Sequence, residues 1–373
     1  MNVTLGWLRV LLALMVIDEH YGFFERLFDG VVKKVGGTLH FSFVSDGDIG
    51  VTGFFIMSGF LIAEILETRY PSHSGKDFLH FVVSRYLRIF PLYLLVFSTY
   101  LLLVVEQEAG WKKIALNVLL VPYGVYDFFA TDHLFNHILL TPAWTLSLDL
   151  VFYPIGYLLF KNRILLLGYF GTLVGYLCWI WVISPSEGGS VFYSEQSWWN
   201  DHVYSTAEPN LFSFLSGMLA RIILNKVRIP PAIIYLALGA LVYVCYLPYG
   251  ISYFGGHFLG QAALVVIITA LARNGSSKME SFLGSLTYST YLIHLPVLLA
   301  VGRLVRPPGP DRLVALAVTI VLSFLVAKFI EEDIVERFRK KWLNGWKPIA
   351  TNAPPLRDGG HHVLFFWGFP LCA

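Results

Sequence analysis

The feature that most constrains this chain is a series of long hydrophobic runs that carry almost no charge. Residues 164–183 contain no Asp, Glu, Lys, Arg or His, and residues 282–302 contain only His294 of that set. Each run matches the roughly 20 apolar residues that a helix needs to cross the core of a bilayer. Charged residues make up 14% of the chain, whereas an average soluble domain has about 25%. This pattern predicts an integral membrane protein.

Hydropathy along the chain predicts an all-α, polytopic membrane helical bundle of about ten transmembrane helices. One further segment, 114–126, is apolar but short and contains Pro122, so we expect it to be re-entrant or interfacial. The predicted spans are residues 5–24, 49–67, 89–105, 143–160, 164–183, 208–225, 232–248, 252–272, 281–302 and 313–332.

Basic residues orient the predicted bundle. When both termini are placed in the cytoplasm, the connections on that side hold the larger share of the lysines and arginines, as the positive-inside rule requires. We predict a transmembrane domain over residues 1–343 and a short, loosely ordered cytoplasmic tail over residues 344–373.

Charge and cysteine content exclude several kinds of partner. The net charge is only +2, and no basic run is interleaved with aromatic residues, so nucleic acid is not an expected partner. Two of the three cysteines, Cys178 and Cys245, lie in apolar runs. A zinc site or a disulfide framework is therefore not expected, and we predict no metal.

Ionisable groups inside the predicted spans are the candidates for chemistry, because each is costly in a membrane. Arg9 and His20 lie eleven positions apart in the first span. At about 100° a residue, both fall on one helix face, about 16 Å apart along the axis. Histidine titrates near neutral pH and is a natural general base for a hydroxyl nucleophile. The alternative is that His20 is a polar residue at the membrane interface.

Two arginines precede the third predicted span. Arg85 and Arg88 are spaced i, i+3 and share a helix face at its cytoplasmic end. Paired guanidinium groups suit the phosphates of a nucleotide-bearing donor. Arginines at a cytoplasmic helix end are also ordinary topology signals, so both interpretations stay open.

The second predicted span contains small residues, including Gly50, Gly53 and the Ser58-Gly59 pair. Small residues permit close approach of a ligand or of another helix. Ser58 could bond a ligand carbonyl, and plain helix packing is the alternative.

Two more ionisable groups lie deep in apolar segments. Asp149 follows Trp144 and Ser147 in the fourth span, and could orient an imidazole or pair with an arginine. His294 could be catalytic, could bind substrate, or could be a satisfied polar group between helices.

Taken together, these segments resemble the acyltransferase-3 family of membrane O-acyltransferases. Five blocks match in order, and FIEEDIVERF at 329–338 is a weaker sixth. The five blocks are Leu8-Arg9 with His20, GVTGFFIMSGFLI at 50–62, SRYLRIFPLY at 84–93, AWTLSLDLVFYP at 143–154 and LGSLTYSTYLIHLPV at 283–297.

The resemblance implies transfer of acetyl, or another short acyl group, from cytoplasmic acyl-CoA to hydroxyls of carbohydrates. Family acceptors include lipopolysaccharide, exopolysaccharide and peptidoglycan sugars, and the implied location is a bacterial inner membrane. Acyl-CoA is a donor substrate, and no permanently bound cofactor is implied. The family motifs Arg-x10-His, Arg-x-x-Arg and Ser-Gly-Phe match Arg9 and His20, Arg85 and Arg88, and residues 58–60.

This sequence departs from the family pattern at two positions. Asp149 stands where the family usually has Glu, which shortens the reach of the carboxylate. Glu331 is followed two positions later by Asp333, where the family usually has Pro, which leaves the role of Glu331 open.

These observations assign a role to each candidate residue. We predict that His20 takes the hydroxyl proton or is transiently acylated, and that Asp149 orients the acceptor or the base. Two other functions stay open, namely a transporter of a lipid-linked sugar or small anion and a membrane O-acyltransferase of the other class with His294 as its base. The donor-binding residues are predicted to be Arg9, Arg85, Arg88, Ser58 and Gly59, and the acceptor-binding residues Trp144, Ser147, Tyr288 and His294.

Overall fold

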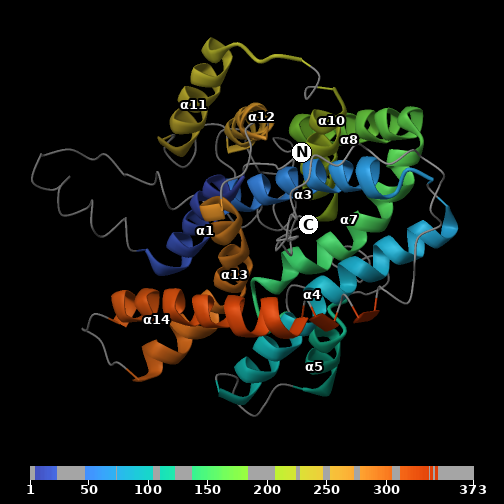
Figure 1. The fold of residues 1–373 in the computed structure, drawn as a ribbon. Coiled ribbons are helices and arrows are strands. Elements are labelled where there is room, and N and C mark those ends of the chain that lie inside the picture. The colour runs from blue at the N-terminus through green and yellow to red at the C-terminus, as the bar shows by residue number, and fades with distance from the viewer. Residues whose placement is uncertain are drawn as a thin grey trace, which may run out of the picture.

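The structure is a computed structural model, and all the regular structure in the residues that it describes is helical (Figure 1). Those residues are 5–22, 47–72, 74–103, 110–121, 137–183, 206–223, 227–246, 253–272, 278–304, 311–335, 337–338 and 341–342.

Each of the ten predicted spans falls on a helix. The predicted tail, 344–373, lies outside the described residues. The helices are α1 (Gly6–Tyr21), α3 (Gly47–Arg69), α4 (Gly75–Leu103), α5 (Trp111–Val118), α7 (Ala143–Lys161), α8 (Arg163–Ile183), α10 (Ala207–Ile223), α11 (Pro231–Tyr246), α12 (Tyr253–Leu271), α13 (Lys278–Leu304), α14 (Asp311–Leu325) and the π-helical segment η4 (Val326–Val335).

Five helical stretches in the described part of the chain have the length and composition to cross a membrane, which indicates an integral multi-pass membrane protein. The count of about ten crossings and the cytoplasmic placement of both termini stay predictions. The five stretches are Gly47–Arg69, Gly75–Leu102, Ala143–Lys161, Phe282–Leu304 and Arg312–Val335.

Helix α3 forms the centre of the bundle. Its apolar window is fully buried, and α1, α7, α10 and α12 pack against it (Figure 1). Two glycines permit the closest of these approaches. A Cβ on Gly59 would lie 1.8 Å from the carbonyl oxygen of Phe214, and one on Gly217 would lie 1.8 Å from that of Ile56. Helix packing between α3 and α10 therefore requires glycine at both positions.

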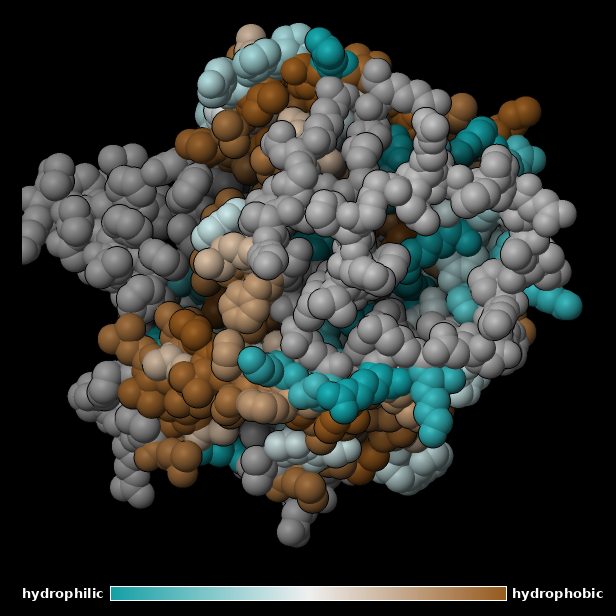
Figure 2. All heavy atoms as spheres, in the orientation of Figure 1, coloured by the Kyte–Doolittle hydropathy of each residue, from teal (hydrophilic) through white to brown (hydrophobic). Residues whose placement is uncertain are grey.

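The outer helices expose apolar side chains. Figure 2 shows hydrophobic residues gathered over α14, where Ile320 and Val321 are each 59% exposed. Exposed apolar side chains on a helix that is long enough to span a bilayer are expected to face lipid. Hydrophobic burial inside the protein and contact with lipid outside thus use opposite faces of the same helices.

Helix α4 differs from its prediction, because it begins at Gly75 and not at residue 89. Ser74 caps the helix start by accepting a hydrogen bond from the backbone N–H of Asp77 at 3.1 Å. Four polar residues ahead of residue 89 are buried in the bundle, namely Asp77, Ser84, Arg85 and Arg88, and the two arginines are only 4% and 3% exposed. Hydropathy left this stretch out of the third predicted span, because it cannot register polar groups that lie inside a protein. The two arginines therefore lie within the helix and not at its end.

Candidate active site

Two histidines from opposite ends of the sequence face each other between α1 and α13. The ring centroids of His20 and His294 are 5.2 Å apart, with 30° between the ring planes. His20 lies in the last turn of α1, which ends where Gly22 adopts a left-handed conformation and its N–H bonds the Asp18 carbonyl. His294 is fully buried and His20 is partly exposed. One imidazole of the pair is therefore accessible and the other is enclosed.

Tyrosine hydroxyls fix the helices around this histidine pair. The Tyr21 hydroxyl donates to the backbone carbonyl of His294 at 2.9 Å and lies 2.9 Å from Thr319 Oγ1, which joins α1 to α13 and α14. The Tyr291 hydroxyl lies 2.8 Å from Thr145 Oγ1, which joins α13 to α7. The sequence pattern did not single out these four residues as site residues. Their only signal was polar atoms in apolar spans, which does not identify a partner.

The two ring nitrogens of His294 have different surroundings. Nδ1 lies 2.6 Å from the carbonyl oxygen of Tyr291. Nε2 is buried and has no hydrogen-bond partner among the described residues. Buried polar groups are nearly always hydrogen-bonded, so an exception beside a second imidazole is a candidate contact point for a ligand or a moving side chain.

The buried carboxylate of Asp149 lies at the contact of α7 with α3. Its Oδ1 accepts a hydrogen bond from Ser58 Oγ at 3.2 Å, and both residues are fully enclosed. The structure therefore brings two predicted site residues together. In the described part of the chain, it shows no hydrogen bond between Asp149 and His20. The sequence had left open whether Asp149 orients an imidazole or pairs with an arginine.

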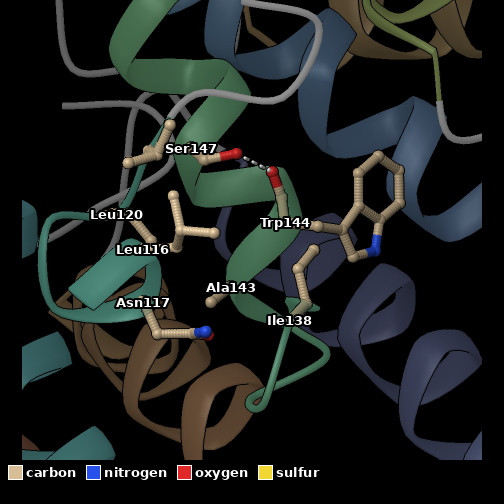
Figure 3. Close-up of a pocket in the computed structure, with 8 residues that line it drawn as sticks. Leu116, Asn117, Leu120, Ile138, Ala143, Trp144 and Ser147 are labelled. Atoms are coloured by element: carbon tan, nitrogen blue, oxygen red, sulfur yellow. Dashed lines mark hydrogen bonds between the residues drawn. The ribbon is translucent and has the colours of Figure 1, made fainter. Parts of the chain in front are cut away.

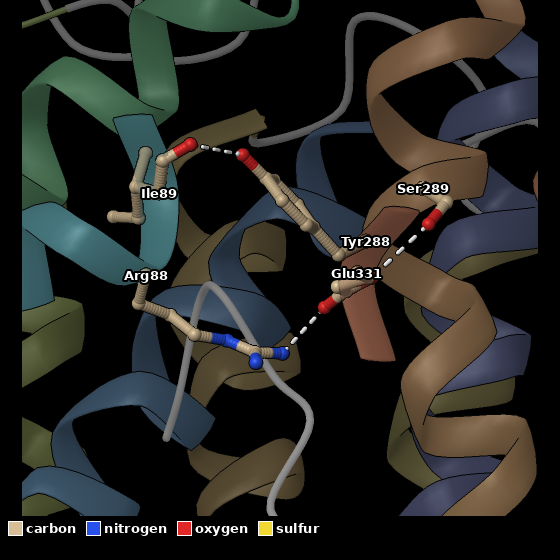
Figure 4. Close-up of polar contacts among 5 residues, drawn as sticks. All are labelled: Arg88, Ile89, Tyr288, Ser289 and Glu331. Carbon is tan, nitrogen blue, oxygen red and sulfur yellow. Dashed lines mark hydrogen bonds and ion pairs between the residues drawn. The ribbon is translucent and has the colours of Figure 1, made fainter. Parts of the chain in front are cut away.

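The second arginine of the Arg-x-x-Arg motif forms a buried ion pair. Arg88 Nη2 lies 2.5 Å from Glu331 Oε1, and Ser289 Oγ donates to the other oxygen of Glu331 at 3.1 Å (Figure 4). Tyr288, a predicted acceptor-binding residue, donates its hydroxyl to the carbonyl of Ile89 at 2.9 Å. These bonds join α4, α13 and η4. They give Glu331 the partner that the sequence could not supply.

The other two predicted donor-binding arginines are also buried. Arg9 Nε contacts the sulfur of Met57 at 3.0 Å, and its side chain is 8% exposed. The Arg85 guanidinium carbon lies 5.6 Å from the centroid of the Phe81 ring, a cation–π distance. Both guanidinium groups therefore lie inside the bundle and not on its surface.

A small, largely apolar pocket opens between α5 and α7 (Figure 3). Two polar side chains on its wall already form hydrogen bonds: Ser147 Oγ donates to the Trp144 carbonyl, and the Asn117 amide bonds three backbone groups. Trp144 and Ser147, two predicted acceptor-binding residues, thus share a pocket, and the Ser147 hydroxyl in it is already bonded. The lining residues are Leu116, Asn117, Leu120, Val121, Ile138, Ala143, Trp144 and Ser147.

Within the described ranges, no three His, Cys, Asp or Glu side chains converge as metal ligands. The groups that do converge are two imidazoles and several hydroxyls in the interior of a multi-pass membrane bundle. This combination defines a class, membrane-embedded proteins whose polar site lies between helices. Such a site supplies groups that can transfer protons inside a membrane, where ionisable residues are rare.

Within that class, the chain belongs to a single family. The profile of that family, described as Acyl_transf_3, an acyltransferase domain, matches residues 2–330. The predicted family resemblance is confirmed. No solved structure matches the chain.

Several curated proteins are similar to this chain. The peptidoglycan O-acetyltransferase OatA of Listeria monocytogenes serovar 1/2a is 23% identical over 357 residues, which cover 85% of this chain and 56% of the relative. The putative peptidoglycan O-acetyltransferase YrhL of Bacillus subtilis (strain 168) is 26% identical over 344 residues, covering 82% and 53%. The O-acetyltransferase OatA of Staphylococcus aureus (strain NCTC 8325 / PS 47) is 26% identical over 359 residues, covering 84% and 55%. The chain spans about half the length of these relatives.

Proposed function

We propose that this protein is a membrane-embedded O-acyltransferase that moves an acetyl group from cytoplasmic acetyl-CoA to a hydroxyl of a cell-surface carbohydrate. The observation that carries the proposal is the partly exposed imidazole of His20, which faces His294 between α1 and α13 inside the matched acyltransferase domain. Acyl transfer to an alcohol needs a base at the nucleophile, and histidine is the usual one.

The proposed reaction uses His20 as that base. The unprotonated nitrogen of His20 takes the proton of the acceptor hydroxyl while the hydroxyl oxygen attacks the thioester carbonyl carbon. The C–S bond then breaks, and the CoA thiolate leaves and receives the proton from the imidazolium. The products are an O-acetyl ester and CoA, and His20 is regenerated. The alternative order, in which His20 is itself acylated first, has the same balance.

Donor binding is proposed at the buried arginines. Arg9, Arg85 and Arg88 would hold the phosphates of CoA, because a guanidinium group forms paired hydrogen bonds with phosphate oxygens. In the structure, the Arg88 guanidinium group is already paired with Glu331, so a CoA phosphate would have to compete with that carboxylate. Phosphate binding at Arg88 would therefore require η4 to move or the ion pair to rearrange.

The central polar pair is proposed to act on the reacting groups. Ser58 would bond the thioester carbonyl, while Asp149 would orient the acceptor from the position where it now accepts the Ser58 hydroxyl. Gly59 is fully engaged in packing against α10, so the structure gives no support for a direct donor contact there. The ring of Trp144, which is tilted by 57° to that of Phe55 with 6.4 Å between the centroids, would contact the acceptor.

The acceptor class is proposed from the relatives. Two of the similar proteins are named for peptidoglycan O-acetylation, so we rank a peptidoglycan sugar above lipopolysaccharide or exopolysaccharide. This proposal places the protein in the plasma membrane of a bacterium, with its acceptor near the outer face.

The test uses the full chain, purified and reconstituted in liposomes. Acetyl-CoA is supplied with peptidoglycan fragments, lipopolysaccharide or exopolysaccharide in turn, and free CoA is measured with a thiol reagent. We expect CoA release that depends on one acceptor class, with a matching O-acetyl ester found by mass spectrometry. Uptake of a glycan or anion into the liposomes without CoA release would contradict the proposal and favour a transporter.

A further inference from the structure

The histidine pair contains two complementary hydrogen-bonding groups that lack partners. The carbonyl oxygen of Tyr291 can only accept a hydrogen bond, so His294 Nδ1, 2.6 Å away, must carry the proton. In neutral imidazole the other nitrogen then has a lone pair and no hydrogen. His294 Nε2 is thus a buried acceptor, and it has no donor among the described residues.

His20 presents the matching donor. A neutral histidine has one N–H group and one lone pair, and the described residues offer His20 no hydrogen bond that fixes which nitrogen carries the hydrogen. A histidine that acts as a base needs that choice fixed, because only the unprotonated nitrogen can accept a proton. In many active sites a carboxylate fixes which nitrogen of the histidine carries the hydrogen. Here the carboxylate of Asp149 accepts a hydrogen bond from Ser58.

The separation of the two rings, which are stacked in the structure, fits a direct bond between them once one ring turns. A ring nitrogen lies about 1.1 Å from its centroid, so an N–H···N bond of about 2.9 Å would hold two imidazole centroids about 5 Å apart. The observed separation is 5.2 Å, with 30° between the planes. Rotation of the partly exposed His20 ring about its own side-chain bonds would align the two nitrogens. His294 itself is held by Tyr291.

We infer that His294 is the positioning residue for His20. The Tyr291 carbonyl fixes the hydrogen on His294 Nδ1, and His294 Nε2 accepts the N–H of His20. This bond fixes the His20 tautomer and directs the remaining lone pair of His20 at the acceptor hydroxyl. The inference rests on the proposed function, because it assigns to His294 the task that a carboxylate performs in a catalytic triad.

Two side-chain replacements separate this role from a structural one. His294→Gln places an amide oxygen near the position of Nε2, so it keeps an acceptor for His20. His294→Asn keeps an N–H near the position of Nδ1 for the Tyr291 carbonyl but loses the acceptor. Melting temperature and gel filtration check that both variants fold, and Leu299→Ala, on an exposed part of α13, is the matched control.

We expect His294→Asn to lower kcat about 100-fold with an unchanged KM for acetyl-CoA. His294→Gln is expected to stay within about tenfold of the unsubstituted protein. Because His294 acts through His20, adding His294→Asn to His20→Ala should lower kcat no further than His20→Ala alone.

Three results would overturn the inference. They are full activity in both His294 variants, equal loss in both, or a double variant whose loss is the product of the single losses. Equal loss would make His294 a base in its own right. The proposed function fails separately, when the unsubstituted protein transfers no acyl group or when His20→Ala keeps full activity.

Discussion

Two of the buried polar clusters in this bundle differ in the groups that they contain, because one contains an ion pair and the other contains two imidazole rings. In the arginine cluster, Arg88 meets Glu331 at 2.5 Å and Ser289 completes the carboxylate. In the histidine cluster, the acceptor nitrogen of His294 meets no donor among the described residues, although the ring is fully buried. Both clusters place polar groups inside a membrane protein, where such groups are costly.

The difference separates a stabilising ion pair from a candidate catalytic site. Matched charges hold α4, α13 and η4 together, and they are expected to matter first for stability. The partly exposed imidazole of His20 beside the buried His294 is expected to matter first for chemistry, because a positioned histidine can transfer a proton. Substitutions in the two clusters should therefore affect different measurements.

The largest expected effect is on catalysis at the histidine cluster. His20→Ala removes the proposed base and should lower kcat about 1,000-fold, because a positioned base contributes about 100-fold to 10,000-fold. The melting temperature should change little, since the His20 side chain is partly exposed. Steady-state CoA release measures the first quantity and a thermal melt the second. Leu14→Ala, at an exposed position of α1, is the control and should match the unsubstituted protein.

The next effect is on stability at the arginine cluster. Glu331→Ala leaves the Arg88 guanidinium buried without its carboxylate and should lower the free energy of unfolding by about 3–5 kcal/mol. Asp333→Ala is the matched control, because the Asp333–Arg337 pair is exposed and should contribute under about 1 kcal/mol. Denaturant unfolding in detergent compares the two. Equal effects would remove the distinction between a buried and an exposed pair.

A smaller effect is expected at the contact of α3 with α10. Gly59→Ala places a methyl group 1.8 Å from the Phe214 carbonyl and should lower the free energy of unfolding by about 2 kcal/mol through overpacking. Gly171→Ala, where a methyl group meets nothing within 4 Å, should be neutral or stabilise by up to about 1 kcal/mol. If Gly59→Ala loses donor affinity without losing stability, the glycine binds donor as predicted from the sequence.

The smallest effect is expected from one hydroxyl beside the histidine pair. Tyr21→Phe removes the bonds to the His294 carbonyl and to Thr319 and should lower the free energy of unfolding by about 1 kcal/mol. Tyr235→Phe, at a 71% exposed position, should change nothing measurable. The same unfolding assay resolves them, and an unchanged stability in Tyr21→Phe would show that this tyrosine does not fasten α1.

The helices were predictable from the sequence because membrane spans are set by long apolar runs, which hydropathy registers directly. Within the described residues, each of the ten predicted spans overlaps a helix. The start of α4 was not predictable in this way. Its first turns carry Asp77, Ser84 and Arg85, and these read as a polar connection although they are buried in the bundle.

The residue types of the candidate site were predictable from the sequence, but the side chain that each of them contacts was not. His20, His294 and Asp149 stand out as ionisable groups in apolar segments. The contact of His20 with His294 joins positions far apart in the sequence, and no local pattern encodes such a contact. The pairing of Asp149 with Ser58 and of Arg88 with Glu331 depends in the same way on how α3, α4, α7 and η4 pack.

The central claim is tested most directly by following a labelled acetyl group. Liposomes containing the unsubstituted protein or His20→Ala receive acetyl-CoA labelled in the acetyl group, together with the acceptor that supports CoA release. Label recovered as a glycan ester with the unsubstituted protein, and at background with His20→Ala, is the predicted result. Equal label in the glycan from both proteins would contradict the account, because acyl transfer would then proceed without the imidazole of His20.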